Sequence, residues 1–139
     1  MMISTKGRYA LRVMEDLAEH KDSGYVPMKD VAARQGISLK YLERILPSLT
    51  KNGLVDAVQG KGGGYRLNRE PEDYSIWDIL EAAEGDLAPV ACLAGDAVVC
   101  ERAEGCRTLP LWEDYYKLSR SFFESRTLAD LMPERTGVQ

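Results

Sequence analysis

The chain has 139 residues, a formal net charge of −4 at pH 7 and 45% hydrophobic residues. This length suits one domain with its own core, and this composition excludes a wholly disordered chain. No apolar run approaches the roughly 18 residues that a membrane span needs, and the first apolar stretch, MMISTKGRYALRV, contains charges that a signal peptide lacks. We therefore expect a cytoplasmic protein that makes no contact with a membrane.

Charge is distributed unevenly along the chain. Residues 1–70 contain 12 Lys and Arg against 8 Asp and Glu, whereas residues 71–139 contain 6 against 14. Phosphate contacts need Lys and Arg, so a basic half beside an acidic half favours one polyanion-binding surface. Chance drift of surface charge is the alternative.

The first half predicts three helices. Residues 4–20 have apolar side chains at helical spacing, and SGYVP at 23–27 ends this helix. The segment VAARQGISLKYLERIL then holds two apolar faces with Gly36 between them, where a tight turn needs a positive φ. Ser38 is the expected N-cap of the second of these helices. A short helix, a glycine turn and a second helix form the helix-turn-helix pattern.

The exposed face of the second helix predicts contacts with DNA bases or phosphates in the major groove. The candidate residues are Ser38, Lys40, Tyr41, Glu43 and Arg44. Pro47 lies inside the same predicted helix, where it removes a hydrogen bond and clashes with the preceding turn. We expect a kink near residues 43–47 or an earlier end to the helix.

Residues 54–67, LVDAVQGKGGGYRL, predict a β-hairpin. Its tip, residues 59–64, contains four glycines and Lys61, so the backbone can approach a groove or phosphate closely. A hairpin directly after a helix-turn-helix is a wing, and its candidate DNA contacts are Gln59, Lys61, Gly62 and Tyr65. We therefore expect residues 1–70 to form a winged helix-turn-helix DNA-binding domain.

An enzymatic function is not expected. A phosphate-binding P-loop needs Ser or Thr after its Gly-Lys pair, but Gly62 follows Lys61. A dinucleotide-binding run from Gly60 would need glycine where Tyr65 stands, and no helix opens there. The chain has one histidine and no pairing of a nucleophile with a base.

The second half, residues 71–139, predicts a cysteine loop and a dimerisation helix. Ser75 and Asp78 resemble a capping box that opens a helix through about Glu84, and Gly85 ends it. Residues 86–108 form an expected loop without periodicity, and this loop contains every cysteine of the chain: Cys92, Cys100 and Cys106. Such a long loop within a compact domain is usually functional or disordered.

A long helix is expected to open at Pro110. Its apolar side chains, at 4-3-4 spacing and on neighbouring positions, are Leu111, Trp112, Tyr115, Tyr116, Leu118, Phe122 and Phe123. This stripe is wider than one thin domain can cover, so we expect it to pack against a second copy of the chain. Packing on its own domain alone is the alternative. Thr127 and Asp130 predict the start of a short final helix.

Several segments resemble the iron–sulfur-cluster regulators of the IscR and NsrR type. They are STKGRYALRVMEDLA, VAARQGISLKYLERIL, KNGLV, GKGGGYRL and three clustered cysteines before LW. The resemblance covers nearly the whole chain. It implies a winged-helix homodimer with a long dimerisation helix, and a cluster on three loop cysteines whose state sets DNA affinity or site choice. It also implies recognition-helix roles for Ser38, Tyr41 and Glu43, and a wing at residues 59–65.

The chain departs from that family at the cluster ligands. Its cysteine spacing is C-x₇-C-x₅-C, whereas the family usually shows about C-x₅-C-x₅-C. Leu109 stands where the IscR type has a fourth-ligand histidine, and Arg8 stands where the NsrR type has an aspartate. His20 is expected at the protein surface, near the end of the first helix. The fourth ligand stays open among Asp96, Glu101, Glu104, Glu15 of a partner subunit and an external ligand.

The chemistry of the cysteines allows further alternatives. Thiolates bind iron–sulfur clusters and soft metals, but a structural zinc site wants four ligands. Thiol oxidation without a metal needs only two neighbouring cysteines, and some family members have no cluster.

These observations predict a mainly α fold with a small β-hairpin wing and a long C-terminal dimerisation helix. The expected function is regulation of transcription through a pseudo-palindromic double-stranded operator, modulated by a 2Fe-2S or 4Fe-4S cluster. Alternatives are a cluster-free regulator that responds to thiol oxidation, a metabolite or a protein partner, and an interaction module that never binds DNA.

Overall fold

The computed structural model describes residues 3–95 and 104–133. In chain order the elements are α1 (Thr5–Glu19), η1 (Lys21–Ser23), α2 (Met28–Gln35), α3 (Leu39–Lys51), β1 (Val55–Val58), β2 (Gly64–Leu67), η2 (Pro71–Asp73), α4 (Ile76–Glu84), η3 (Ala91–Leu93), α5 (Leu109–Glu124) and η4 (Leu128–Leu131), where η marks a 3₁₀ turn. The fold is mainly helical with one two-stranded antiparallel hairpin, as expected from the sequence. Within the described ranges, no helix is long and apolar enough to cross a membrane.

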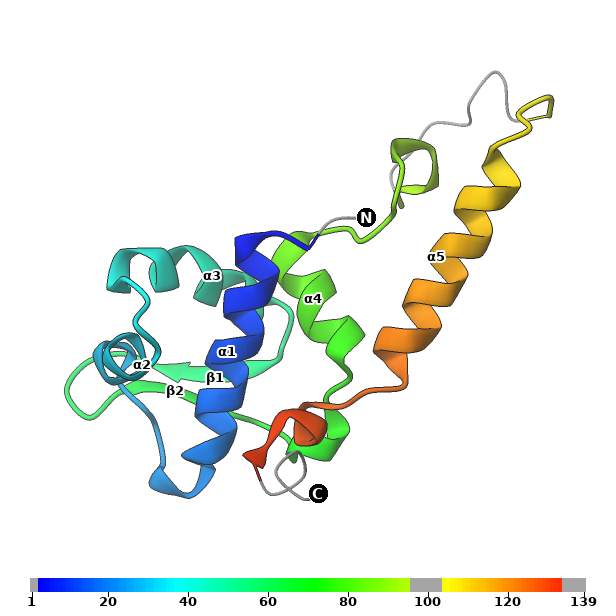
Figure 1. Cartoon of the computed structure of the whole chain (residues 1–139). Helices are drawn as coiled ribbons and strands as arrows, with labels where there is room; N and C mark the ends of the chain where they lie inside the picture. The colour runs from blue at the N-terminus through cyan, green and yellow to red at the C-terminus, as the bar shows by residue number, and fades with distance from the viewer. Residues whose placement is uncertain (1–2, 96–103, 134–139) are drawn as a thin grey trace.

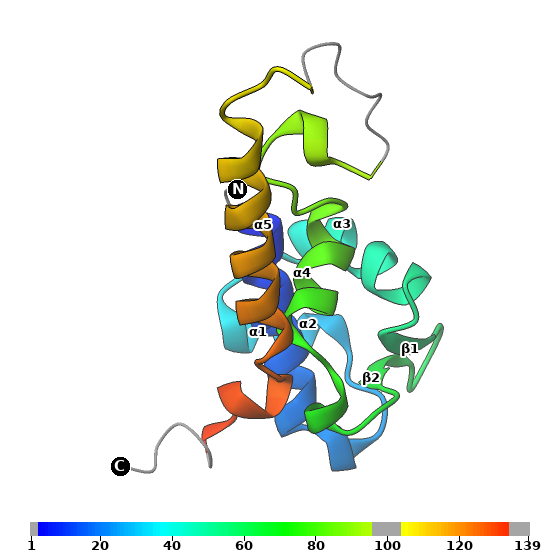
Figure 2. The same ribbon diagram turned by 90° about the vertical axis from the view of Figure 1, so that its right-hand side faces the viewer.

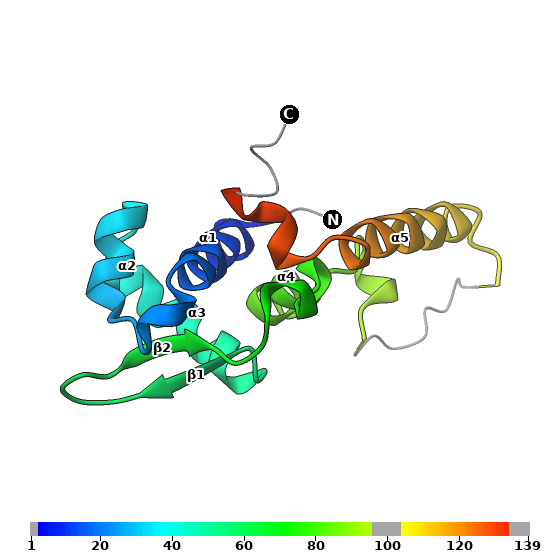
Figure 3. The ribbon, with the colours of Figure 1, turned by 90° about the horizontal axis from the view of Figure 1, so that it is seen from below.

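Helix α1 lies at the centre of the molecule. It has α2 and α3 on one side and α4 on the other, and α5 lies outermost, beyond α4 (Figures 1 and 3). Figure 2 shows α5 along the outer face of this arrangement. Helix α1 begins after Ser4, whose hydroxyl accepts a hydrogen bond from Lys6 N at 3.2 Å. The predicted first helix is therefore confirmed.

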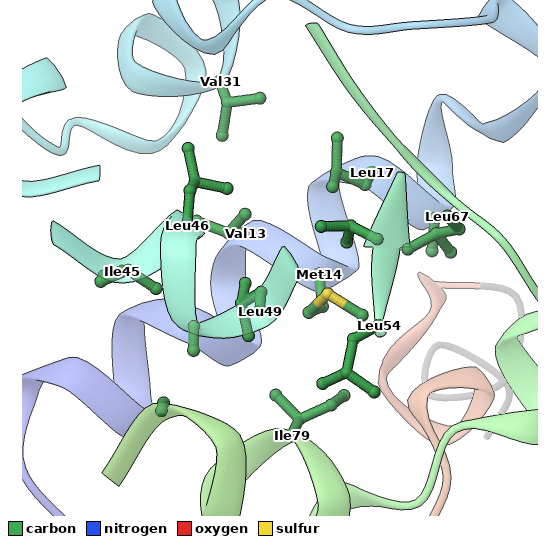
Figure 4. Close-up of a cluster of buried hydrophobic side chains, with 14 of the residues drawn as sticks. Val13, Met14, Leu17, Val31, Ile45, Leu46, Leu49, Leu54, Leu67 and Ile79 are labelled. Atoms are coloured by element: carbon green, nitrogen blue, oxygen red, sulfur yellow. The ribbon is translucent and has the colours of Figure 1, made fainter. Parts of the chain in front are cut away.

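The main core forms where α1, α3, α4 and the hairpin meet. Figure 4 shows its central side chains, which include Val13, Met14, Leu17, Val31, Ile45, Leu46, Leu49, Leu54, Leu67 and Ile79. Tyr74 is also fully buried, and its hydroxyl donates to the carbonyl of Leu54 at 2.7 Å. Burial of these apolar side chains is the main force that stabilises the fold. The core thus includes side chains from both sides of residue 70.

Helix α3 continues through Pro47 to Lys51. Of the two outcomes expected around Pro47, an early end to the helix is therefore wrong. Proline has no backbone N–H, so the Glu43 carbonyl loses its usual donor four residues later. Both residues are exposed, and water can replace that donor. The apolar face of α3 stays buried on both sides of the proline, which favours continuation of the helix.

The predicted hairpin is confirmed, with β1 and β2 antiparallel and Val55 opposite Leu67. Gly64 belongs to β2, so the turn at the tip is shorter than the sequence suggested. Val26, between η1 and α2, forms an isolated bridge to Tyr65, with N–O distances of 2.8 and 2.9 Å. This bridge fixes the start of β2, close to the turn of the hairpin, to the segment that precedes α2.

The C-terminal part returns to the core after α5. Backbone hydrogen bonds join Ile76 N to the Arg126 carbonyl and Leu128 N to the Tyr74 carbonyl, each at 2.9 Å. Thr127 and Asp130 form the predicted capping box. The element that they open is the 3₁₀ turn η4. In the described part of the expected irregular loop at 86–108, residues 86–95 and 104–108, the structure has one short 3₁₀ turn, η3.

Candidate nucleic-acid interface

The polar face of α3 begins at its N-cap. Ser38 has an extended backbone, and its hydroxyl accepts a hydrogen bond from Tyr41 N at 3.1 Å. Gly36, with a φ of 66°, makes the preceding turn, as expected. The predicted contact residues Ser38, Lys40, Glu43 and Arg44 are all exposed. The first turns of α3 therefore present two cations, a carboxylate and a hydroxyl to solvent.

Tyr41 differs from these residues because it is half-buried. Its ring meets the ring of Tyr9 edge to face, with centroids 5.2 Å apart. The Arg12 guanidinium lies 5.3 Å from the Tyr9 centroid, and its Nε donates to the Gln35 side chain at 3.2 Å. Tyr41 therefore packs α3 against α1 in addition to its place on the polar face.

A buried carboxylate on α1 holds the end of α2. Asp16 accepts hydrogen bonds from Arg34 Nη2 at 2.7 Å and from Gln35 Nε2 at 3.0 Å. Burial alone raises the pKa of Asp16, but these hydrogen bonds and the Arg34 charge lower it below its usual value. Asp16 was not among the candidate residues predicted from the sequence. Its position between the inward-facing Val13 and Leu17 was the available signal, because a charge there needs a partner.

The wing is built from glycines in conformations that L-residues rarely adopt. Gly60 and Gly62, at the tip, have φ angles of 92° and 79°. Gly64 has a φ of 147°, and a Cβ there would collide with the Val26 carbonyl. Exposed Lys61 lies at the tip, whereas half-buried Tyr65 packs against the core. The tip can therefore approach another molecule closely while its root stays fixed.

The start of α3 and the wing lie at the same end of the molecule. Figures 1 and 3 show α2, the N-terminal turns of α3 and the hairpin tip at the end opposite α5. The predicted residues Gln59, Lys61 and Gly62 belong to this tip and are exposed. The structure thus brings the two predicted contact regions together.

The cysteine segment is the stretch 86–108 between α4 and α5, and its described parts lie at the other end of the molecule (Figures 1 and 2). Cys92 lies in η3 and is exposed, and the Sγ of half-exposed Cys106 lies 3.4 Å from Thr108 Oγ1. Cys100 lies outside the described residues, as do Asp96 and Glu101. Among the described residues, no three His, Cys, Asp or Glu side chains are grouped so as to hold a metal ion. The two described thiols nevertheless have the chemistry and accessibility that an iron–sulfur cluster requires.

His20 and Glu15, which were discussed with the cluster ligands, both lie near the end of α1. His20 caps the end of α1 with its Nδ1 2.9 Å from the Asp16 carbonyl, and it is partly exposed. Glu15 Oε2 is buried and has no hydrogen-bond partner among the described residues. Burial, followed by the nearby charge of Glu19, raises the pKa of Glu15 to about 7.

Helix α5 has two apolar faces. Tyr116 and Phe123 pack inward on a second core cluster around Trp77, so these two side chains do not widen the exposed stripe as the sequence suggested. Burial and the nearby charge of Asp86 raise the pKa of Tyr116. The outer face exposes large side chains: Leu111 (60%), Trp112 (36%), Tyr115 (39%), Leu118 (71%) and Phe122 (51%).

An exposed recognition helix followed directly by a two-stranded wing defines the winged helix-turn-helix class of DNA-binding proteins. Residues 3–134 match the Rrf2 family, described as an iron-dependent transcriptional regulator. The chain belongs to the Rrf2 family of transcription regulators, and it is not an enzyme. Family membership and the fold agree with the resemblance found in the sequence.

Individual relatives support this assignment. The chain is 38% identical over 139 residues to the HTH-type transcriptional regulator IscR of Aliivibrio salmonicida. The alignment covers 100% of this chain and 82% of the relative. It is similar to the solved structure of T. potens IscR, with a TM-score of 0.70, 38% identity, and coverage of 94% and 85%. It is also similar to CymR (YrzC), the global cysteine regulator of B. subtilis, with a TM-score of 0.71, 32% identity, and coverage of 100% and 99%.

Proposed function

We propose that this transcription regulator acts in the cytoplasm as a homodimer on a pseudo-palindromic operator, and that an iron–sulfur cluster on Cys92, Cys100 and Cys106 modulates its binding. The observation that carries the proposal is the gathering of the polar N-terminal face of α3 and the Lys61-bearing wing at one end of the molecule. Residues 1–70 would read the DNA, and residues 71–139 would dimerise and sense.

The proposed DNA contacts fall into groups according to the chemistry of their side chains. Lys40, Arg44 and Lys61 are exposed cations suited to phosphates, and they lie in the half of the chain that carries the net positive charge. Ser38 can hydrogen-bond to a phosphate or to a base edge, and the Glu43 carboxylate can accept a hydrogen bond from the amino group of a base. Tyr41 orients α3 and reaches the same face, and Tyr65 holds β2 against the core. Gln59 and Gly62 let the tip approach a groove.

The exposed face of α5 supports a two-fold dimer. Leu118 and Phe122 line a hollow of about 460 Å³ together with Tyr115, Ser119, Phe123 and Ile3. A second α5 in this hollow would remove these side chains from water, which favours association. A two-fold axis there would also present two α3 helices to two operator half-sites.

The cysteine segment supports a sensory role because it joins α4 to the proposed dimer helix. A bound cluster would supply a redox-sensitive and oxygen-sensitive link between thiolates that are separate in sequence. Cys106 stands three residues before α5 and Cys92 seven residues after Gly85, so they can fix the segment near both of its ends. A change in this segment would alter the spacing of the two α3 helices in a dimer.

A cluster-free regulator is the second candidate. The similarity to CymR favours it, since CymR is the global cysteine regulator of B. subtilis. Leu109 and Arg8 stand where the IscR and NsrR types carry fourth ligands, and neither side chain ligates iron. Thiol oxidation, a metabolite or a protein partner would then supply the signal.

The decisive experiment is anaerobic purification followed by iron and sulfide analysis and an absorption spectrum. Iron and sulfide in equal amounts, with absorption that bleaches in air, would establish the cluster. A protein that stays colourless after reconstitution would contradict it and favour the second candidate. An operator titration of the Cys92→Ala, Cys100→Ala, Cys106→Ala variant, with a thermal melt as its control, separates lost sensing from lost folding. Lack of DNA affinity even at low salt would favour an interaction module.

A further inference from the structure

Glu84, the last residue of α4, caps the N-terminus of α1. Its Oε2 accepts hydrogen bonds from Ser4 N at 2.7 Å and from Gly7 N at 3.1 Å, and Ser4 Oγ donates to Oε1 at 2.8 Å. The first N–H groups of a helix have no partner within the helix, and the helix dipole is positive there. A carboxylate therefore stabilises this end of α1, although 80 residues separate Ser4 from Glu84.

Gly7 leaves room for this carboxylate. A Cβ at Gly7 would lie 2.6 Å from Glu84 Oε2 and 3.1 Å from Leu80 Cδ2. Gly7 is inside α1 and its φ is an ordinary helical one, so no left-handed conformation requires glycine there. Glycine is also a poorer helix former than alanine. The space that Glu84 occupies therefore accounts for glycine at this position.

Asp86, two residues later, holds the start of the cysteine segment. Its Oδ1 accepts from Ala88 N at 2.7 Å, and its Oδ2 accepts from Gly95 N at 2.9 Å. These bonds fold the stretch that contains Cys92 back onto residue 86. Leu87 is 2% exposed in the second core cluster and anchors the same place.

We propose that Glu84 and Asp86 form a coupling element that transmits the state of the cysteine segment to the first turns of α1. Glu84 holds α1, Asp86 holds the segment, and only Gly85 lies between them. A change that pulls Gly95 or Ala88 away from Asp86 loosens the end of α4 and with it the cap on α1. The regulatory meaning of this coupling rests on the function proposed above.

The route continues to the DNA-reading face. Tyr9 lies two residues after Gly7, in the same turns of α1, and its ring packs against Tyr41 of α3. Loosening the cap therefore affects the helix turn that supports the recognition helix. This path uses contacts within one subunit and is independent of any dimer interface.

Hydrogen–deuterium exchange of the full-length protein tests the coupling directly. The readout is the exchange rate of the peptide that covers Ser4 to Tyr9, compared between the wild type and Asp86→Ala. We expect Asp86→Ala to raise that rate by about threefold or more, because the cap then opens more often. Glu81→Ala is the matched control, since Glu81 is an exposed carboxylate on the same helix. Equal rates in the wild type and Asp86→Ala would overturn the coupling element.

The regulatory consequence is tested with Gly7→Ala, which changes no charge and collides most closely with the Glu84 carboxylate. The operator Kd is measured for the anaerobic iron-loaded protein and for the variant with all three cysteines replaced by alanine. The ratio of these two Kd values is the regulatory ratio. It is determined once in the wild-type background and once in the Gly7→Ala background. We expect Gly7→Ala to bring the ratio about threefold closer to one, with the thermal midpoint showing that the fold is intact. A ratio that Gly7→Ala leaves unchanged would overturn the transmission to DNA binding.

The two measurements separate the hypotheses. If the ratio of operator Kd values is one without Gly7→Ala, while Asp86→Ala raises the exchange rate of the Ser4–Tyr9 peptide, cysteine-dependent regulation is contradicted. The coupling element alone is then supported. A ratio different from one, with uncoupled exchange, would support the proposed function and overturn the coupling element.

Discussion

Asp16 of α1 and Arg34 of α2 form a two-point ion pair in which only the arginine reaches solvent. Arg34 Nη2 donates to Oδ1 at 2.7 Å and Nε donates to Oδ2 at 3.0 Å. The Asp16 side chain is 1% exposed and that of Arg34 is 36% exposed. This pair holds the last turn of α2 just before the Gly36 turn, which leads into α3.

Asp16→Ala should lower the free energy of unfolding by about 2 kcal/mol, because Arg34 and Gln35 lose a buried acceptor but can partly rehydrate. Urea unfolding measures the change, with the exposed Asp22→Ala as its control. Because the pKa of Asp16 in the fold lies below its ordinary value of 3.8, its stabilising contribution is complete above that pH and is lost as the pH falls through the folded value. Equal acid sensitivity of wild type and Asp16→Ala would contradict this.

Glu15 should give the opposite pH dependence. Its pKa is raised from 4.5 to about 7, so the fold favours the protonated form. The stability associated with that proton is complete below pH 4.5 and is lost as the pH rises to about 7. Between these values the wild type should lose about 1 kcal/mol relative to Glu15→Gln, after allowance for partial exposure. Denaturant melts at several pH values test this; parallel curves for the two proteins would refute it.

Gly64→Ala should destabilise the protein more than Gly60→Ala. Both residues have a positive φ, but only Gly64 faces a neighbouring backbone, the Val26 carbonyl. We expect a loss of about 3 kcal/mol at Gly64 and about 1 kcal/mol at Gly60, since the first combines strain with a broken bridge. Thermal unfolding of the two variants compares them. Similar midpoints would show that the start of β2 is less rigid than the Val26–Tyr65 bridge indicates.

Removal of one phosphate-binding cation should reduce the salt dependence of operator binding. Arg44→Ala or Lys61→Ala is expected to make the slope of log K against log salt shallower by about 0.9. Lys117→Ala, which removes an exposed cation from α5, should leave the slope unchanged. The test is a set of operator titrations at several salt concentrations. A slope that does not respond to either wing or helix variant would remove these residues from the interface.

Leu118→Glu should shift the protein towards monomers, because a charge would replace the most exposed apolar side chain of α5. Sedimentation equilibrium measures the association constant, which we expect to fall by about a hundredfold or more. Glu113→Gln, a change at an exposed polar position of the same helix, is the control. An unaltered dimer in Leu118→Glu would place the interface elsewhere.

Local patterns predicted most of the fold. The caps at Ser38, Ser75 and Thr127, the turn at Gly36 and the hairpin depend on neighbouring residues, so they could be derived from short stretches of sequence. Pro47 was harder, because burial of the apolar face on both sides outweighs one missing hydrogen bond. The exposed residues on α3 and at the wing tip followed from periodicity once the helix and hairpin were placed.

Long-range pairings could not be derived in this way. In the sequence, Glu84 is an ordinary polar residue at the end of a helix. Nothing near it in the sequence indicates that it caps α1, whose N-cap Ser4 lies 80 residues earlier. Tyr116 and Phe123 belong to the same apolar stripe as Leu118, and only the position of α4 decides which of them point inward. The cysteines could be recognised as chemically special, but their spacing says little about their arrangement in space.

The sparse attachment of the cysteine segment bears on how this fold diversifies. Among the described residues of 88–108, none is a buried core side chain, while Leu87 just before them is. Substitutions and length changes in this segment therefore cost the core of the DNA-binding part little stability. A response to a new stimulus can then evolve without changes to α3 or the wing. The chain is similar over nearly its whole length to both an IscR and a cysteine regulator, which accords with separate change of the proposed sensing segment and the DNA-binding part. Evolution can therefore replace this segment while the rest of the fold is kept.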